Sequence, residues 1–124
     1  QRVDGRLVSL NIVHLGLIAF IPLPHQFLGL YGHEPIAYVF YAGVLGAVNT
    51  MELVLFLYAR RARLFRVEPS LPEARAEASR HLVVTAGCLL SMPLAYVLLG
   101  LTPIIWIVLL PLARLVVRRQ GVAP

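Results

Sequence analysis

The sequence has few charged residues, no lysine and a single cysteine. Charged residues make up 14% of its 124 positions and hydrophobic residues 59%, whereas an average soluble domain has about 25% charged residues. A soluble core of this composition would leave a large apolar surface in contact with water. Because Cys88 is the only cysteine, a disulfide framework and a cysteine-based metal site are excluded. The composition therefore predicts an integral membrane protein.

Signatures of nucleic-acid binding and of catalysis are also missing. The net charge is +5, but no basic stripe alternates with aromatic side chains, so we expect no nucleic acid as partner. There is no nucleophile–base pair, phosphate loop or cysteine–histidine cluster, so we expect neither an enzyme nor a bound cofactor. His14 and His25 would lie ~16 Å apart along one helical face, too far to share a metal.

Four apolar runs have the length, or nearly the length, of a membrane-spanning helix, which needs ~20 apolar residues. They cover residues 7–30, 36–59, 82–100 and 103–117. Pro22 and Pro24 should kink or unwind the end of the first run. The fourth run is short, so a re-entrant hairpin of the last two runs is an alternative. The sequence predicts an all-α membrane bundle with four transmembrane helices, in one domain covering residues 1–124.

The arginines indicate the orientation of this bundle. All eleven basic residues are arginines, and they flank the apolar runs, whereas residues 31–35 and 100–103 carry none. Four crossings would place every arginine on one face, which the positive-inside rule makes cytoplasmic. We therefore expect a multi-pass protein of the cell inner (plasma) membrane, with both ends of this chain and the 60–81 loop in the cytoplasm.

Two further features concern the start of the chain and the predicted loop. Residues 1–6 resemble neither a signal peptide nor a natural start, so we expect the chain to be the C-terminal part of a longer protein. Ser70 and Glu73 have the spacing of a helix-capping box, and residues 73–78 are strong helix formers. A helix should therefore begin inside the loop and continue into the third run.

Four of the polar side chains inside the first two runs form two pairs, one in each run. His14 comes eight residues after Arg6 and Glu52 eight before Arg60, so both should lie ~12 Å from the same end of the bundle. An asparagine precedes each by three residues, on the same helical face. We predict a polar layer of Asn11, His14, Asn49 and Glu52. Both an ion or proton path and simple interhelical hydrogen bonding remain open, and Arg114 is an alternative partner for Glu52.

A face of small residues runs along the second apolar run. Its members Gly43, Gly46, Ala47 and Thr50 follow the spacing i, i+3, i+4, i+7. Small residues let membrane helices approach closely. We interpret this face as a helix-packing surface, with a pore lining as the alternative.

Short motifs in residues 4–61 resemble a known membrane family. They are Leu10-Asn11, Ile21-Pro22-Leu23-Pro24, Leu28-Gly29-Leu30-Tyr31-Gly32, Tyr41 and Tyr58-Ala59-Arg60-Arg61. These motifs are similar to the third and fourth helices of the bacterial and endolysosomal potassium channels that lack a pore loop. That family has a six-helix repeat. Beyond Arg61 only the pattern of helices agrees, so the chain resembles helices three to six.

The resemblance implies a potassium-selective channel subunit, with cytoplasmic termini and a homo-oligomeric assembly that is tetrameric in bacteria. It also implies an ion path lined by the family's first helix, which carries a Phe-Ser-Asp signature absent from this sequence. This chain would then supply scaffold helices in contact with the lipid bilayer, around a pore helix that conducts the potassium ion. Asn11 would be placed to hydrogen-bond to that pore helix.

Two other functions remain open from the sequence. Glu52 is the only acidic residue deep in a predicted span, which suits a small four-helix transporter coupled to protonation of this carboxylate. A membrane assembly module without transport activity is the third interpretation. The channel predicts potassium flux, the transporter predicts proton-coupled uptake, and the assembly module predicts no flux.

Overall fold

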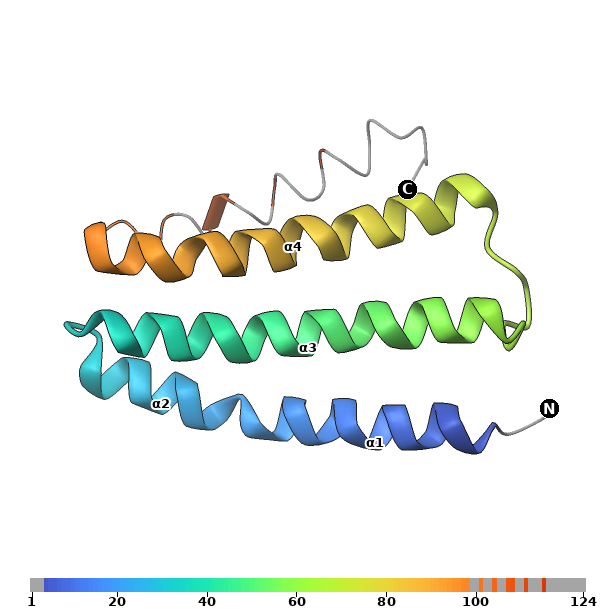
Figure 1. Cartoon of the computed structure of the whole chain (residues 1–124), viewed down its shortest axis with the longest axis horizontal. Helices are drawn as coiled ribbons and strands as arrows, with labels where there is room; N and C mark the ends of the chain where they lie inside the picture. The colour runs from blue at the N-terminus through green and yellow to red at the C-terminus, as the bar shows by residue number, and fades with distance from the viewer. Residues whose placement is uncertain are drawn as a thin grey trace.

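The protein, seen in a computed structural model, is described for residues 4–98 and for 101, 104, 107, 108, 111 and 115. Its helices are α1 (Gly5–Phe20), α2 (Pro22–Tyr31), α3 (Pro35–Arg61) and α4 (Leu71–Val97). Helix α3 lies between α4 on one side and α1 and α2 on the other (Figure 1). No strand occurs among the described residues. The predicted all-α class is therefore confirmed for this part of the chain.

Three helical segments are long and apolar enough to cross a membrane. They are Gly5–Tyr31, which joins α1 and α2, then Pro35–Arg61 and Leu71–Val97, each of 27 residues. A helix of this length extends ~40 Å, more than the ~30 Å hydrocarbon core of a bilayer. Within the described residues, three potential spans are found rather than the predicted four. The fourth predicted span, residues 103–117, lies mostly outside the described residues.

The two prolines near the end of the first span separate α1 from α2. Helix α1 ends at Phe20, and Pro22 occupies the first turn of α2, where its missing N–H would have no helical partner. The Ile21 N–H donates to the Ile18 carbonyl at 3.0 Å, a tighter turn than in an α-helix. The axis of α2 is consequently inclined to that of α1 (Figure 1). The predicted kink is confirmed.

The connection between α3 and α4 is shorter than the predicted 60–81 loop. Helix α3 ends in a Schellman motif, in which the Leu64 N–H donates to the Ala59 carbonyl at 2.9 Å and Arg63 adopts φ 52°. Helix α4 then begins at Leu71, and Ser70 and Glu73 form the predicted capping box. Residues 71–81 are therefore helical, because this cap starts a helix that continues directly into the third apolar run.

Small residues bring α3 and α4 into close contact. A Cβ atom placed on Gly46 would lie 3.5 Å from Cys88 Cβ, and one on Gly43 would lie 3.6 Å from Met92 Cε. Thr50 donates a hydrogen bond to the Gly46 carbonyl and lies 3.5 Å from the Thr85 hydroxyl, between Oγ1 atoms. Ala47, the remaining member of the predicted packing face, is exposed.

Helix α1 contacts α3 through a narrow stripe. Its partly buried positions are Leu7, Leu10, His14 and Leu17, which repeat at the three- and four-residue spacing of one helical face. Most of the other α1 side chains are exposed and apolar, including Ile12 and Val13. At the other end of the first span, aromatic rings join α2 to α3. Phe40 packs edge-to-face on Phe20 and Phe27.

The described arginines gather toward one end of the bundle. This end holds the start of α1, the end of α3 and the start of α4 (Figure 1). Arg6 lies in the first turn of α1, and Arg60 and Arg61 end α3. The opposite turn, residues 32–34, contains no arginine. The predicted orientation rests on this unequal distribution of arginines between the two ends of the bundle.

Candidate functional site: a polar cluster across three helices

Glu52 of α3 lies between a histidine of α1 and a histidine of α4. Its Oε1 atom is 3.8 Å from His14 Nε2, and its Oε2 atom is 3.7 Å from His81 Nδ1. Because α3 is the central helix, a side chain at this position can reach both neighbours. The Glu52 side chain is 43% exposed, so the cluster opens to one side of the described bundle.

Asn49, one turn before Glu52, ties α3 to α4. Its Nδ2 atom donates to the His81 carbonyl at 2.7 Å and to Thr85 Oγ1 at 2.8 Å. Its Oδ1 atom lies 2.8 Å from His81 Nδ1. A single amide thus makes three polar contacts with the neighbouring helix, as expected for side chains that hold membrane helices together.

His81 is the centre of the cluster, and its position was not predicted. The residue is buried, with 4% of its surface exposed. Its Nε2 atom lies 3.3 Å from Glu77 Oε1, an oxygen that also accepts a hydrogen bond from Arg80 Nη2. Sequence reasoning placed His81 in the cytoplasmic part of a helix that continues into the third run, and so left it out of the polar layer. Glu77, His81 and Thr85 recur every four residues, and this spacing along one helical face was the available signal.

The structure brings together three of the four residues of the predicted polar layer. His14, Asn49 and Glu52 all contribute to the cluster. Asn11 does not, because it points to the exposed side of α1 and makes no hydrogen bond within the described residues. Arg114, the alternative partner predicted for Glu52, lies outside the described residues.

His14 carries an unusual feature. Its Nδ1 atom is buried and has no hydrogen-bond partner in the described part of the protein. The neutral tautomer with hydrogen on Nε2 places that N–H toward Glu52 and leaves Nδ1 as a bare acceptor. His14 therefore directs one ring nitrogen at Glu52 and leaves the other buried without a partner among the described residues.

The chain matches no protein-family model, no curated protein and no solved structure. The resemblance of residues 4–61 to potassium channels without a pore loop therefore stays a prediction from sequence motifs. The chemistry of the cluster has to be argued from its own geometry. Among the described residues, no group of three or more His, Cys, Asp or Glu side chains is arranged to hold a metal ion.

A separate contact ties the start of α1 to the end of α3. Asp4, the N-cap of α1, accepts hydrogen bonds from the Arg6 N–H and from the Tyr58 hydroxyl. The Tyr58 hydrogen bond, followed by that from Arg6, lowers the pKa of the Asp4 carboxyl below its ordinary value of 3.8. Both bonds favour the ionised carboxylate. The arginine-rich end of the bundle is thus joined by a contact between Asp4, which precedes the first span, and Tyr58, near the end of the second.

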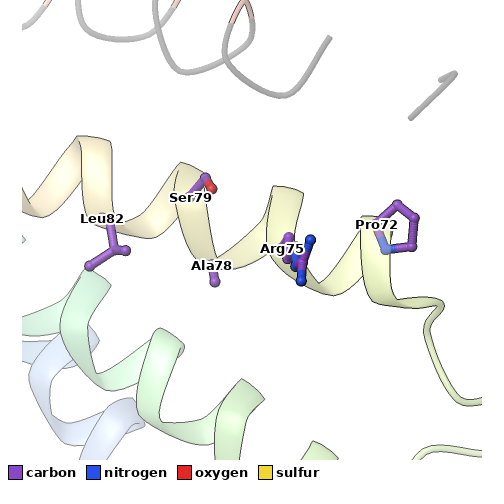
Figure 2. A pocket seen from close by; sticks show the side chains of 5 residues that line it. All are labelled: Pro72, Arg75, Ala78, Ser79 and Leu82. Atoms are coloured by element: carbon purple, nitrogen blue, oxygen red, sulfur yellow. The ribbon is translucent and has the colours of Figure 1, made fainter. Parts of the chain in front are cut away.

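A surface hollow of about 610 Å³ lies along the first half of α4. Figure 2 shows the side chains that line it, which are Pro72, Arg75, Ala78, Ser79 and Leu82. Arg75 is the charged group among these lining residues, and no member of the polar cluster contributes to the hollow. The polar cluster is therefore separate from this hollow.

Proposed function

We propose that these helices are the scaffold of a potassium-selective channel subunit, around a pore helix that this chain does not contain. The support for a scaffold comes from the outer face of α1, and the support for potassium comes from the resemblance of residues 4–61. We further propose that the arginine-rich end faces the cytoplasm of a cell with this protein in its plasma membrane. The subunit would assemble as a homo-oligomer, a tetramer by resemblance.

Asn11 is the observation that carries the scaffold proposal. This amide is exposed, among the exposed apolar side chains Val8, Ile12 and Leu15. A polar group that faces lipid tails without a hydrogen-bond partner is unfavourable. An exposed asparagine in a spanning helix therefore favours a further helix packed on this face. In the resemblance, the residue at this position is the one that can bond to the pore helix.

Potassium flux tests the function directly. The whole protein that contains this chain would be reconstituted in liposomes loaded with potassium, and efflux would be compared with that from empty vesicles. We expect efflux that exceeds the background and that is selective for potassium over sodium. Efflux equal to that of empty vesicles would contradict the channel proposal and would favour an assembly module without transport.

Asn11→Leu tests the scaffold separately from the ion. Loss of an interhelical hydrogen bond in a membrane costs about 0.6 kcal/mol on average and up to ~1.7, so the variant should assemble less stably. Ile12→Leu, on the same face, is the matched control because it changes no polar group. If Asn11→Leu stabilises the assembled protein instead, Asn11 faces lipid and the scaffold proposal is wrong.

Proton-coupled transport is the second candidate, and the position of Glu52 favours it. A carboxylate within a span, flanked by His14 and His81 and open on one side, is the kind of group that carries protons in transporters. Glu52→Gln keeps the size of the side chain but removes its titration. Proton-driven uptake that survives this substitution would exclude the transporter.

A further inference from the structure

The hollow along the first half of α4 changes from charged to apolar as it follows the helix. Its lining begins with Pro72 and Arg75 at the arginine-rich end, passes Ala78 and Ser79, and ends at Leu82 (Figure 2). Positions 72, 75, 79 and 82 are three or four residues apart and so share one helical face. This face presents a cation, then a hydroxyl group, then an aliphatic side chain.

Arg75 carries a charge that no described residue balances. It is exposed, and no described carboxylate lies within ion-pair distance of it. The carboxylates two residues to either side have other partners. Glu73 accepts the Ser70 N–H of the capping box, and Glu77 pairs with Arg80. The Arg75 guanidinium is therefore available to an anion, and its fork of N–H donors fits the oxygens of a phosphate group.

The hollow lies where α4 would pass from the polar to the apolar part of a bilayer. Leu82 is the first residue of the third apolar run, and Ser79 and Arg75 lie ~4 Å and ~10 Å before it along the helix axis. The two headgroup layers together add about 10–15 Å to the hydrocarbon core of a bilayer, and a long arginine side chain can bring its charge into such a layer from a neighbouring turn. Beyond Leu82 the same face continues with the exposed Ala86 and Leu89, which offer an apolar surface to acyl chains.

We propose that this hollow binds an anionic phospholipid, with the phosphate group at Arg75 and an acyl chain along Leu82, Ala86 and Leu89. A free phosphate ion would use only the charged end of the hollow, whereas a phospholipid matches the order of charge, hydroxyl and apolar surface along it. The proposal rests on the proposed membrane orientation, because the cytoplasmic leaflet carries the anionic phospholipids. It does not depend on the ion that the protein conducts.

Fluorescence quenching by brominated phospholipids tests the site at a single position. Leu82→Trp, at an exposed lining residue, would be introduced into the whole protein after its other tryptophans have been replaced by phenylalanine. The variant would be reconstituted in vesicles of phosphatidylcholine and phosphatidylglycerol, with bromine on the acyl chains of one lipid at a time. We expect this tryptophan to prefer phosphatidylglycerol over phosphatidylcholine by about fivefold, the factor that one arginine contributes at an anionic membrane surface.

Substitution of Arg75 in the same background should abolish that preference. Arg75→Gln should bring the preference close to one, whereas Arg75→Lys, which keeps the charge, should retain most of it. Arg66→Gln is the matched control, because Arg66 is an exposed arginine of the 62–70 connection and does not line the hollow. A preference that survives Arg75→Gln, or that Arg66→Gln removes equally, would contradict the site.

The quenching of the Leu82→Trp protein alone remains decisive if the arginine variants do not fold. Equal quenching by both lipids would show that position 82 meets lipid without a site for the anionic headgroup. Absence of quenching by either lipid would show that protein covers this face, and loss of the preference in phosphate buffer, but not in chloride of the same ionic strength, would show that a free phosphate binds instead. Each of these results would overturn the proposal. A protein without potassium flux that still prefers phosphatidylglycerol at position 82 would leave the site standing, and one with flux but without this preference would remove the site alone.

Discussion

At the scale of single residues, one amide holds two spanning helices together. Asn49 makes polar contacts with the backbone of His81, the ring of His81 and the hydroxyl of Thr85. Interhelical hydrogen bonds in membranes average only about 0.6 kcal/mol each. Removal of one partner is more costly than that average, because the partner left behind is a buried donor without an acceptor.

Substitution of Asn49 should therefore destabilise the bundle measurably. Asn49→Ala leaves the His81 Nδ1–H without its acceptor, and we expect a loss of ~1–3 kcal/mol in unfolding free energy. Denaturation in mixed detergent micelles would measure it. Ser9→Ala is the control, because the Ser9 hydroxyl donates to the Gly5 carbonyl within its own helix. Equal effects of the two substitutions would show that the Asn49 contacts do not stabilise the interface.

The Asp4–Tyr58 contact predicts a titration outside the spanning segments. Hydrogen bonds from Tyr58 and from the Arg6 N–H lower the Asp4 pKa in the folded protein. A lowered pKa stabilises the folded state above pH 3.8, and this stabilisation is lost as the pH falls below 3.8 through the folded value. The carboxyl ¹³C signal of Asp4 should titrate below 3.8 and move upward in Tyr58→Phe. An identical midpoint in the variant would rule out the Tyr58 contribution.

Single residues also show how far the sequence could predict the cluster. The shared depth of His14 and Glu52 followed from the rise of a helix and from two arginine anchors, and the structure places the two side chains 3.8 Å apart. Asn11 was assigned to the same layer because it precedes His14 by three residues. These positions still differ by about 60° around the helix axis. The rotation of α1 about its own axis decides which of the two residues faces α3. The spacing of residues in the sequence does not determine this rotation.

At the scale of helices, the contact between α3 and α4 depends on small residues. Glycine at position 46 faces Cys88, and a Cβ there would meet Cys88 Cβ at 3.5 Å, an ordinary van der Waals contact. A larger side chain has no such space. The register that pairs Gly46 with Cys88 also pairs Asn49 with Thr85, so a displacement at one contact would strain the other.

Two substitutions of Gly46 should have opposite outcomes. Gly46→Ala should fold with little change, whereas Gly46→Leu should cost ~1–3 kcal/mol through overpacking. Gly16→Leu is the control, because a Cβ at Gly16 meets nothing within 4 Å. Thermal unfolding of the three variants in one detergent would compare them. Gly46→Leu as stable as Gly16→Leu would show that α3 and α4 do not pack through this face.

The helices themselves were largely readable from the sequence, but the pairing of α3 with α4 was not. Ser70 and Glu73 predicted where α4 begins, and Pro22 predicted where α1 ends, because capping and proline effects are local. His81 was overlooked because the arginine-rich stretch before it placed the start of this helix in the cytoplasm, outside the predicted span. Its role arises from the register of α4 against α3, which is a tertiary property.

At the scale of the whole molecule, the three long apolar helices of the described residues form a bundle whose arginines gather toward one end. The spans Gly5–Tyr31, Pro35–Arg61 and Leu71–Val97 run in alternating directions (Figure 1). Crossing by all three would place the 32–34 turn on one side of the membrane and the 62–70 connection on the other. The scaffold proposal depends on this arrangement, because it requires each of these spans to cross the bilayer.

Cysteine labelling of the whole protein in intact cells tests this arrangement most directly. Cys88 is buried and would be replaced by alanine, together with any cysteine elsewhere in the protein. Single cysteines would then be introduced at His33 and at Arg66. A membrane-impermeant maleimide applied from outside should label position 33 at once, and position 66 only after the cells are permeabilised. Labelling of both positions from the same side would contradict a bundle in which α3 crosses the membrane.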